Sequence, residues 1–164
     1  MRITKEYRFE AAHRLMEHQG ACANIHGHSY KVEITLSGWL RPEGAARGMV
    51  LDFQDLNAVV HPVLYDGFEN TNGEKHEPLD HSIILCAGDS LAPTMLDAQA
   101  RNGKPLRVVL LGLDPTAEYL AEWIAKMVNR MLGEKYPEDS LLPTVTEVTV
   151  WETSKARATW RVDG

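Results

Sequence analysis

Residues 22–37, Cys-Ala-Asn-Ile-His-Gly-His-Ser-Tyr-Lys-Val-Glu-Ile-Thr-Leu-Ser, carry the clearest structural signal in the chain. From His26 onward apolar and polar side chains alternate, which is the pattern of a β-strand with one buried face. His26 and His28 share the parity of the apolar side chains that follow them, namely Tyr30, Val32, Ile34 and Leu36. We therefore predict a strand over 26–38 with both histidines on its buried side, at the end where it begins.

A similar alternation runs through residues 2–13, whose buried face would hold Ile3, Tyr7, Phe9, Ala11 and His13. If the two strands pair as a hairpin, both deliver histidine to the buried side at the same end of the sheet. Neutral imidazoles at about 2.0–2.1 Å suit Zn²⁺, and three protein ligands leave a fourth position open, as catalytic zinc requires. The predicted zinc ligands are His13, His26 and His28.

Cys22 stands four residues before the first histidine of the pair, and two roles are open for it. A nearby divalent cation or protonated histidine would favour its thiolate, the form that acts as a base or nucleophile. The alternative is a fourth ligand in a structural Cys-His₃ zinc site. The other cysteine, Cys86, belongs to no motif, and two cysteines without a disulfide framework indicate reduced thiols.

The composition is that of an ordinary globular protein: of 164 residues, 44% are hydrophobic and 24% are charged. The length predicts one domain, 1–164, with a sizeable core. A formal net charge of −6 argues against nucleic acid held by a general electrostatic field. No apolar run approaches the about 20 residues that span a bilayer, and the N-terminus does not have the pattern of a signal peptide. We expect a cytoplasmic protein that binds neither nucleic acid nor membrane.

Two amphipathic helices are predicted after the first hairpin. Asp52 can cap the first, whose apolar side would hold Phe53, Leu56, Val59, Val60 and Val63. Pro62 falls late in this pattern and can kink or end the helix. Asp114 and Pro115 are interpreted as the cap and first-turn proline of the second, whose apolar stripe comprises Ala117, Leu120, Ala121, Ile124, Val128, Met131 and Leu132.

Alternation returns near the C-terminus, where Val148, Val150 and Glu152 share one parity before a turn and residues 156–162 alternate again. This pattern predicts a closing hairpin. The order β-β-α-α-β-β predicts an α+β domain, in which a four-stranded antiparallel sheet is covered on one face by two helices. Residues 66–105 show little periodicity, and a surface insertion is expected at about 86–105.

Two acidic groups are candidate site residues. Glu152 lies on the apolar face of its predicted strand, where a carboxylate is costly unless it is paired. It could accept two hydrogen bonds from the N–H and NH₂ edge of a pterin-like ring, or it could simply be a strand-end glutamate in solvent. Asp80 and His81 are adjacent, which by itself does not mean that one orients the other.

Six segments follow one another over nearly the whole chain: Phe9-Glu-Ala-Ala-His13-Arg-Leu, Cys22-x₃-His26-Gly-His28-Ser-Tyr, Gly48-Met-Val-Leu-Asp52-Phe, Leu79-Asp80-His81, Pro115-Thr-Ala-Glu118 and Trp151-Glu152-Thr. Together they resemble the 6-pyruvoyl-tetrahydropterin synthase superfamily. The Cys-x₃-His-Gly-His spacing is similar to that of its bacterial 6-carboxy-5,6,7,8-tetrahydropterin synthase branch, which serves queuosine and 7-deazaguanine (preQ0) biosynthesis. The resemblance implies a T-fold, in which three subunits join their sheets into a barrel and two trimers stack as a homohexamer.

The resemblance also implies roles for individual residues: zinc ligands His13, His26 and His28, catalytic base Cys22, a second catalytic pair Asp80 and His81, and pterin-anchoring Glu152. The implied substrate is 7,8-dihydroneopterin triphosphate, and the implied products are 6-carboxy-5,6,7,8-tetrahydropterin, acetaldehyde and triphosphate. Two alternatives are a 6-pyruvoyl-tetrahydropterin synthase, which is a triphosphate lyase, and a non-catalytic zinc- and pterin-binding protein of the same fold. The thiol favours an enzyme, because binding alone does not need it.

Overall fold

The computed structural model describes residues 1–69, 73–101 and 106–162. At its centre, β1 (Arg2–His13) and β2 (His26–Ser37) pair antiparallel in an unbroken register. The register runs from Arg2 opposite Ser37 to His13 opposite His26. Both strands have the predicted bounds to within one residue, and the predicted faces are confirmed, because the apolar side chains of both strands are buried along most of their length.

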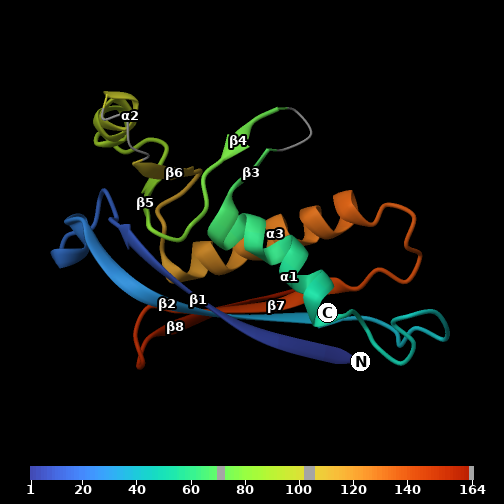
Figure 1. Cartoon of the computed structure of the whole chain (residues 1–164). Helices are drawn as coiled ribbons and strands as arrows, with labels where there is room; N and C mark the ends of the chain where they lie inside the picture. The colour runs from blue at the N-terminus through green and yellow to red at the C-terminus, as the bar shows by residue number, and fades with distance from the viewer. Residues whose placement is uncertain (70–72, 102–105, 163–164) are drawn as a thin grey trace.

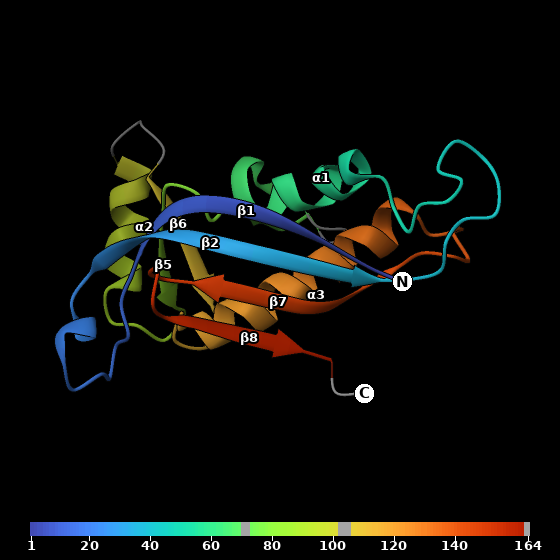
Figure 2. The same cartoon turned by 90° about the horizontal axis from the view of Figure 1, so that it is seen from below.

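This hairpin is the middle of a curled six-stranded sheet with the order β6-β5-β1-β2-β7-β8 (Figures 1 and 2). β7 (Thr144–Trp151) and β8 (Arg157–Arg161) form the predicted C-terminal hairpin and are antiparallel to their neighbours. β5 (Ser82–Cys86) and β6 (Arg107–Leu111) are parallel to each other, and β5 is parallel to β1. The prediction of a four-stranded, wholly antiparallel sheet is therefore wrong.

The two additional strands escape a search for alternation because they do not alternate. β5 reads Ser-Ile-Ile-Leu-Cys and β6 reads Arg-Val-Val-Leu-Leu, so each is almost continuously apolar. Continuous apolar runs are typical of parallel strands that are buried on both faces. The connection between them contains a third helix, α2 (Ala92–Arg101), within the segment expected to be a surface insertion. Residues 102–105 of that segment lie outside the described residues.

The first predicted helix is α1 (Phe53–His61), and it begins at the expected cap. The Asp52 carboxylate accepts a hydrogen bond from the Gln54 N–H at 2.7 Å. Pro62 ends the α-helical hydrogen bonding, and a single π-helical turn (Pro62–Asp66) follows. A short separate hairpin of β3 (Phe68–Glu69) and β4 (Lys75–His76) then leads to β5.

The second predicted helix is α3 (Ala117–Lys135), but its cap differs from the expected one. The Thr116 hydroxyl accepts a hydrogen bond from the Tyr119 N–H at 3.2 Å, so Thr116 is the N-cap in place of Asp114. Pro115 consequently stands before the cap instead of in the first turn. Its carbonyl oxygen lies 2.7 Å from the His13 Nδ1 atom of β1.

α1 and α3 lie on the same side of the sheet, and the core fills the space between them and the apolar sheet face (Figure 1). The part of this core that α3 supplies comprises Ala117, Leu120, Ala121, Ile124, Ala125, Val128 and Leu132. Among the described helices, none has the length and apolar character that crossing a lipid bilayer requires.

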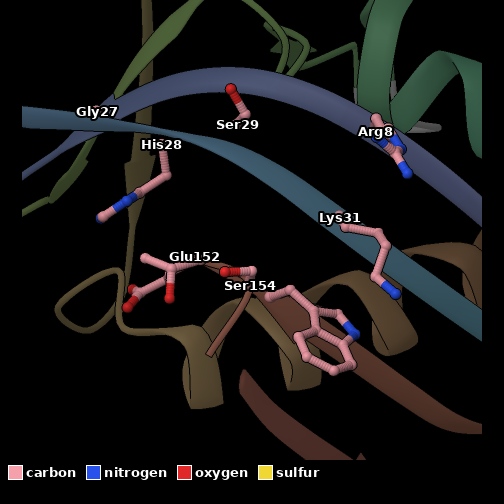
Figure 3. Close-up of a pocket in the computed structure, with 9 residues that line it drawn as sticks. Arg8, Gly27, His28, Ser29, Lys31, Glu152 and Ser154 are labelled. Atoms are coloured by element: carbon pink, nitrogen blue, oxygen red, sulfur yellow. The ribbon is translucent and has the colours of Figure 1, made fainter. Parts of the chain in front are cut away.

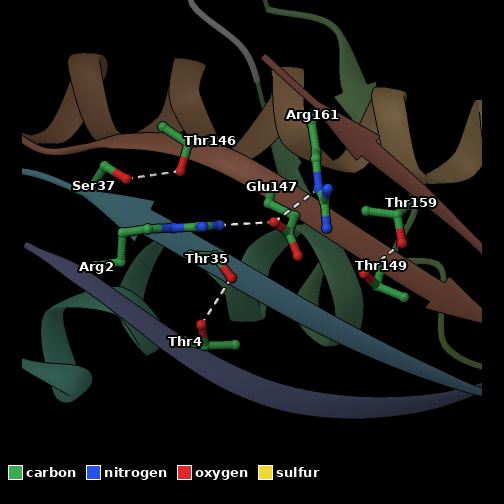
Figure 4. Close-up of polar contacts among 9 residues, drawn as sticks. All are labelled: Arg2, Thr4, Thr35, Ser37, Thr146, Glu147, Thr149, Thr159 and Arg161. Carbon is green, nitrogen blue, oxygen red and sulfur yellow. Dashed lines mark hydrogen bonds and ion pairs between the residues drawn. The ribbon is translucent and has the colours of Figure 1, made fainter. Parts of the chain in front are cut away.

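The opposite sheet face carries polar side chains that pair across the strands (Figure 4). Three hydroxyl pairs lie 2.8–2.9 Å apart: Thr4 with Thr35, Ser37 with Thr146, and Thr149 with Thr159. The Glu147 carboxylate accepts hydrogen bonds from Arg2 on one side and Arg161 on the other. This face is thus built to remain polar, and no described helix covers it (Figure 2).

Candidate metal centre and active site

Three histidines meet at the end of the β1–β2 hairpin. His13 pairs directly with His26, and His28 pairs with Ala11, so the register places all three rings on the helix-covered side. One ring nitrogen from each lies within 4.8 Å of the others. The ring centroids are 4.5–5.1 Å apart. The predicted convergence of the three histidines is confirmed.

Backbone carbonyls set which nitrogen of two of these rings carries the proton. His13 Nδ1 lies 2.7 Å from the Pro115 carbonyl oxygen, and His26 Nδ1 lies 2.9 Å from that of Asn24. A carbonyl can only accept, so both Nδ1 atoms donate and both Nε2 atoms present lone pairs. Donation of the second ring nitrogen to a carbonyl is the arrangement that orients metal-bound histidine.

The two Nε2 atoms fit a shared cation. They face each other at 3.1 Å, a distance at which two lone pairs repel unless a positive charge lies between them. Two nitrogens bound to one tetrahedral Zn²⁺ would lie about 3.3–3.4 Å apart. His13 is 2% exposed, and this burial lowers its pKa to about 4, with smaller contributions from the two neighbouring histidines. The neutral ring is the form that binds metal.

Cys22 lies beside this cluster. It belongs to a short 3-10 turn (Ala21–Ala23) in the β1–β2 connection and is partly exposed. It lines a cavity of about 380 Å³ together with all three histidines and Glu152. The first turn of α3 closes the same cavity and contributes Glu118. Among the described residues, only the three histidines have donor atoms close enough together to share one metal ion. Cys22 is not part of this group.

Glu152 lies one residue beyond β7, where the chain turns back toward β8. Its Oε1 is 4.0 Å from His13 Nε2, so it borders the histidine cluster. It also lines a second, larger cavity of about 650 Å³, shown with its lining residues in Figure 3. His28 and Glu152 point toward each other at one end of that cavity. Glu152 is therefore neither inside the strand nor a solvent-facing strand end, and it joins two cavities.

Asp80 and His81 form a hydrogen-bonded pair, which their adjacency did not establish. The His81 Nδ1–H donates to Asp80 Oδ2 at 2.8 Å, and Asp80 Oδ1 accepts from the Glu10 N–H at 2.9 Å. The His81 N–H donates to the Glu10 carbonyl, which holds the pair against β1. His81 has φ = 56°, a left-handed conformation uncommon outside glycine, and its side chain is 72% exposed. Such strained residues cluster at functional sites.

Within one chain, however, this pair lies apart from Cys22. His81 lines a third cavity, of about 370 Å³, along β1, β2 and the start of β5. His28 is the residue that this cavity shares with the one containing Cys22. The structure thus unites Cys22, Glu152 and the histidines, and leaves Asp80 and His81 on the neighbouring surface.

Glu118 is a candidate that sequence reasoning did not select. It was available as part of the Pro115-Thr-Ala-Glu118 motif, but a helix-start glutamate has an ordinary explanation, because carboxylates favour the N-terminal turn. Only the docking of α3 beside the hairpin reveals that this glutamate lines the Cys22 cavity.

The family profile described as 6-pyruvoyl tetrahydropterin synthase matches residues 2–163. The chain belongs to this family. Among its relatives, the 6-carboxy-5,6,7,8-tetrahydropterin synthase of Haemophilus influenzae is 34% identical over 155 residues, covering 93% of this chain and 92% of that protein. The protein of the same name from Aquifex aeolicus is 28% identical and covers 97% and 96% of the two chains.

Two solved structures share the fold of this chain. An uncharacterised protein from Wolinella succinogenes superposes with a TM-score of 0.71 at 23% identity, over 99% of this chain and 98% of that one. The 6-pyruvoyl tetrahydropterin synthase of Caenorhabditis elegans does so with a TM-score of 0.62 at 22% identity, over 99% and 96%. At these identities the likeness establishes the mixed α+β fold alone.

Proposed function

We propose that this chain is a zinc-dependent carbon–carbon lyase that converts 7,8-dihydroneopterin triphosphate into 6-carboxy-5,6,7,8-tetrahydropterin, acetaldehyde and triphosphate. The observation that carries the proposal is the cavity in which the Cys22 thiol lies beside three histidines with converging nitrogens. The names of the relatives support this choice of reaction. The reaction would supply queuosine and 7-deazaguanine biosynthesis in the cytoplasm.

His13, His26 and His28 would hold the metal. A three-nitrogen set with an open fourth position suits zinc, which would supply Lewis acidity toward the oxygens of the substrate side chain. The carbonyls that accept from His13 and His26 keep their metal-binding nitrogens unprotonated. This arrangement prepares the site before substrate arrives.

Cys22 would act as the base. The thiolate is the reactive form of cysteine, and Cys22 lines the same cavity as the three histidines. His81 would hold or move a second proton at Nε2, because Asp80 accepts from its Nδ1 and so fixes the tautomer. The two groups line different cavities of one chain, so we infer that each active site is completed by a neighbouring subunit.

The assembly proposed is a homohexamer formed by two stacked trimers. In the single chain β6 and β8 are the edges of the sheet, with unpaired backbone groups along one side. Pairing such edges between subunits removes a surface prone to uncontrolled association. It would also bring the His81 surface of one subunit toward another.

Glu152 is proposed to anchor the pterin through paired hydrogen bonds to its N–H and NH₂ groups. Glu118 lines the same cavity and is the competing carboxylate. Glu152→Gln and Glu118→Gln keep the shape but remove the charge. We expect Glu152→Gln to weaken pterin binding at least about 10-fold, with bound zinc unchanged. A weakening confined to Glu118→Gln would transfer the anchoring role to Glu118.

The experiment that tests the reaction is incubation of the zinc-loaded protein with 7,8-dihydroneopterin triphosphate. The expected products are 6-carboxy-5,6,7,8-tetrahydropterin by mass analysis and an equivalent of acetaldehyde by a coupled assay. A pyruvoyl product without acetaldehyde would instead identify a triphosphate lyase, and an unchanged pterin would indicate a binding protein.

The matched variant is Cys22→Ala. If Cys22 is the base, this variant keeps its zinc and fold but loses about 10²–10⁴-fold or more in rate. If Cys22 is a structural ligand, the variant loses zinc and stability together, because structural zinc contributes directly to folding. Undiminished turnover would contradict both roles.

A further inference from the structure

A row of cationic side chains crosses the uncovered sheet face next to the proposed active site. In the strand registers Arg8 lies opposite Lys31, Lys31 opposite Trp151, and Trp151 opposite Arg157. Lys31 Nζ lies 4.3 Å from the centre of a Trp151 ring, and Arg157 Cζ lies 4.4 Å from it. Three cations from β1, β2 and β8 are thus held in one line, and the indole on β7 positions two of them.

The fold alone does not call for this row. Like charges directly opposite each other on neighbouring strands, such as Arg8 and Lys31, destabilise a sheet. Glu6 pairs with both of them and Glu33 pairs with Lys31, but all of these side chains remain at least partly exposed to solvent, which weakens ion pairs. Arg157 forms no ion pair with the part of the chain that the structure describes. The cationic side chains of this row can therefore still bind an anion.

The larger cavity connects this row to the active site. β2 pairs with β7 only from Lys31 onward, because β7 ends at Trp151 and turns away toward β8. The resulting gap of about 650 Å³ has Arg8 and Lys31 at one end and His28 and Glu152 at the other (Figure 3). On the far side of Trp151, Arg157 lines the smaller cavity that holds Cys22.

We propose that Arg8, Lys31 and Arg157 form the subsite for the triphosphate of the substrate. The assignment rests on the proposed function and adds a specificity element to the same site. Guanidinium groups bind phosphate through paired donors and lysine binds it as a point charge, so the row supplies both kinds of contact. The chain carries a net charge of −6, and a polyanion would be repelled without such a local concentration of positive charge.

Lys31→Gln and Arg157→Gln test the subsite, with Arg161→Gln as the matched control. Arg161 lies on the same strand and face as Arg157, four residues further along, and pairs with Glu147. Calorimetric titration with inorganic tripolyphosphate should give affinities about 10-fold or more weaker for each test variant, and wild-type affinity for the control. Affinity for unphosphorylated 7,8-dihydroneopterin should be unchanged in all three variants. In turnover, the test variants should raise KM with little change in kcat.

Equal tripolyphosphate binding by wild type and both test variants would overturn the subsite, as would equal weakening in Arg161→Gln, which would indicate only general charge attraction. Loss of binding to the unphosphorylated pterin would show that the row serves the ring instead. Failure of the proposed function is separate: wild-type protein would then release no acetaldehyde, whatever the tripolyphosphate titrations give. Turnover with unchanged tripolyphosphate affinities would keep the function and reject the subsite.

Discussion

His13 shows how much the chemistry of one side chain depends on its surroundings. Alternation places it on the buried face, but its hydrogen-bond partner is the carbonyl of Pro115, 102 positions further along the chain. That contact fixes the tautomer, and burial disfavours the protonated ring. A solvent-exposed histidine in the same sequence pattern would have neither property.

The buried His13 predicts a pH dependence of the metal-free fold. Its pKa is lowered to about 4, against about 6.5 in the unfolded chain. Between these values the unfolded state binds more protons, so the free energy of unfolding should fall as the pH drops from about 6.5 to about 4. His13→Gln removes this titrating group, so the free energy of unfolding of the variant should fall by about 1–3 kcal/mol less over the same pH range. Urea titrations in the presence of a chelator measure it, and an unchanged slope would contradict the burial argument.

Metal content tests the histidine cluster directly. Wild-type protein should carry about one zinc per chain, and His28→Ala should lose most of it, because two nitrogens hold zinc far less tightly than three. His18→Ala is the control, since that exposed ring accepts one hydrogen bond, from the Gly20 N–H, and lies outside the group of converging histidines. Full zinc content in His28→Ala would remove this residue from the ligand set.

At the level of helices and strands, the elements with regular periodicity agree with their predictions, and those without it do not. α3 presents its apolar stripe as expected, yet it begins at Thr116, two residues after the predicted cap. Asp and Thr are both good N-caps, so residue preference alone does not separate Asp114 from Thr116. The side chain that reaches the free N–H of the first turn makes the difference.

This cap assignment is measurable. Thr116→Ala should lower the free energy of unfolding by about 1 kcal/mol, and Thr116→Ser should restore most of it, because serine supplies the same hydroxyl. Asp114→Ala should have a smaller effect, since the Asp114 carboxylate accepts a long hydrogen bond, 3.5 Å, from the Met16 N–H. Equal losses at both positions in chemical denaturation would contradict Thr116 as the cap.

For the whole molecule, the separation of Cys22 from the Asp80–His81 pair makes assembly part of catalysis. If neighbouring subunits complete each site, Cys22→Ala and His81→Ala are both inactive as pure preparations. Unfolding and refolding them together should form mixed hexamers in which about a quarter of the sites combine an intact Cys22 with an intact His81. Acetaldehyde release near a quarter of the wild-type rate is expected.

The control for this experiment is the same mixture without unfolding and refolding, which should stay inactive as long as the subunits do not exchange. Light scattering at micromolar concentration should show a hexamer for each variant. An active monomer, or no recovered activity in a verified mixed hexamer, would place the whole site within one chain.

The sequence alone determined the features that repeat along the chain. The β1–β2 hairpin, the shared face of its three histidines, α1 and the C-terminal hairpin follow from local periodicity, which reports which face of an element avoids water. The zinc ligands could be predicted because strand pairing converts parity directly into neighbouring side chains. The family motifs added candidate site residues, such as Cys22 and Asp80. The alternation of apolar and polar residues says nothing about the chemical role of these two.

Only the tertiary structure decided the features that depend on segments far apart in the chain. β5 and β6 are almost continuously apolar, and no local pattern separates such runs from other buried segments, so only their parallel pairing with β1 and with each other identifies them as strands. The proximity of Glu118 to Cys22, and the row that joins Arg8 to Arg157 across four strands, exist only once α3 docks and the registers are set. The physical reason is that packing and strand pairing are non-local, whereas a sequence pattern reports the surroundings of one element at a time.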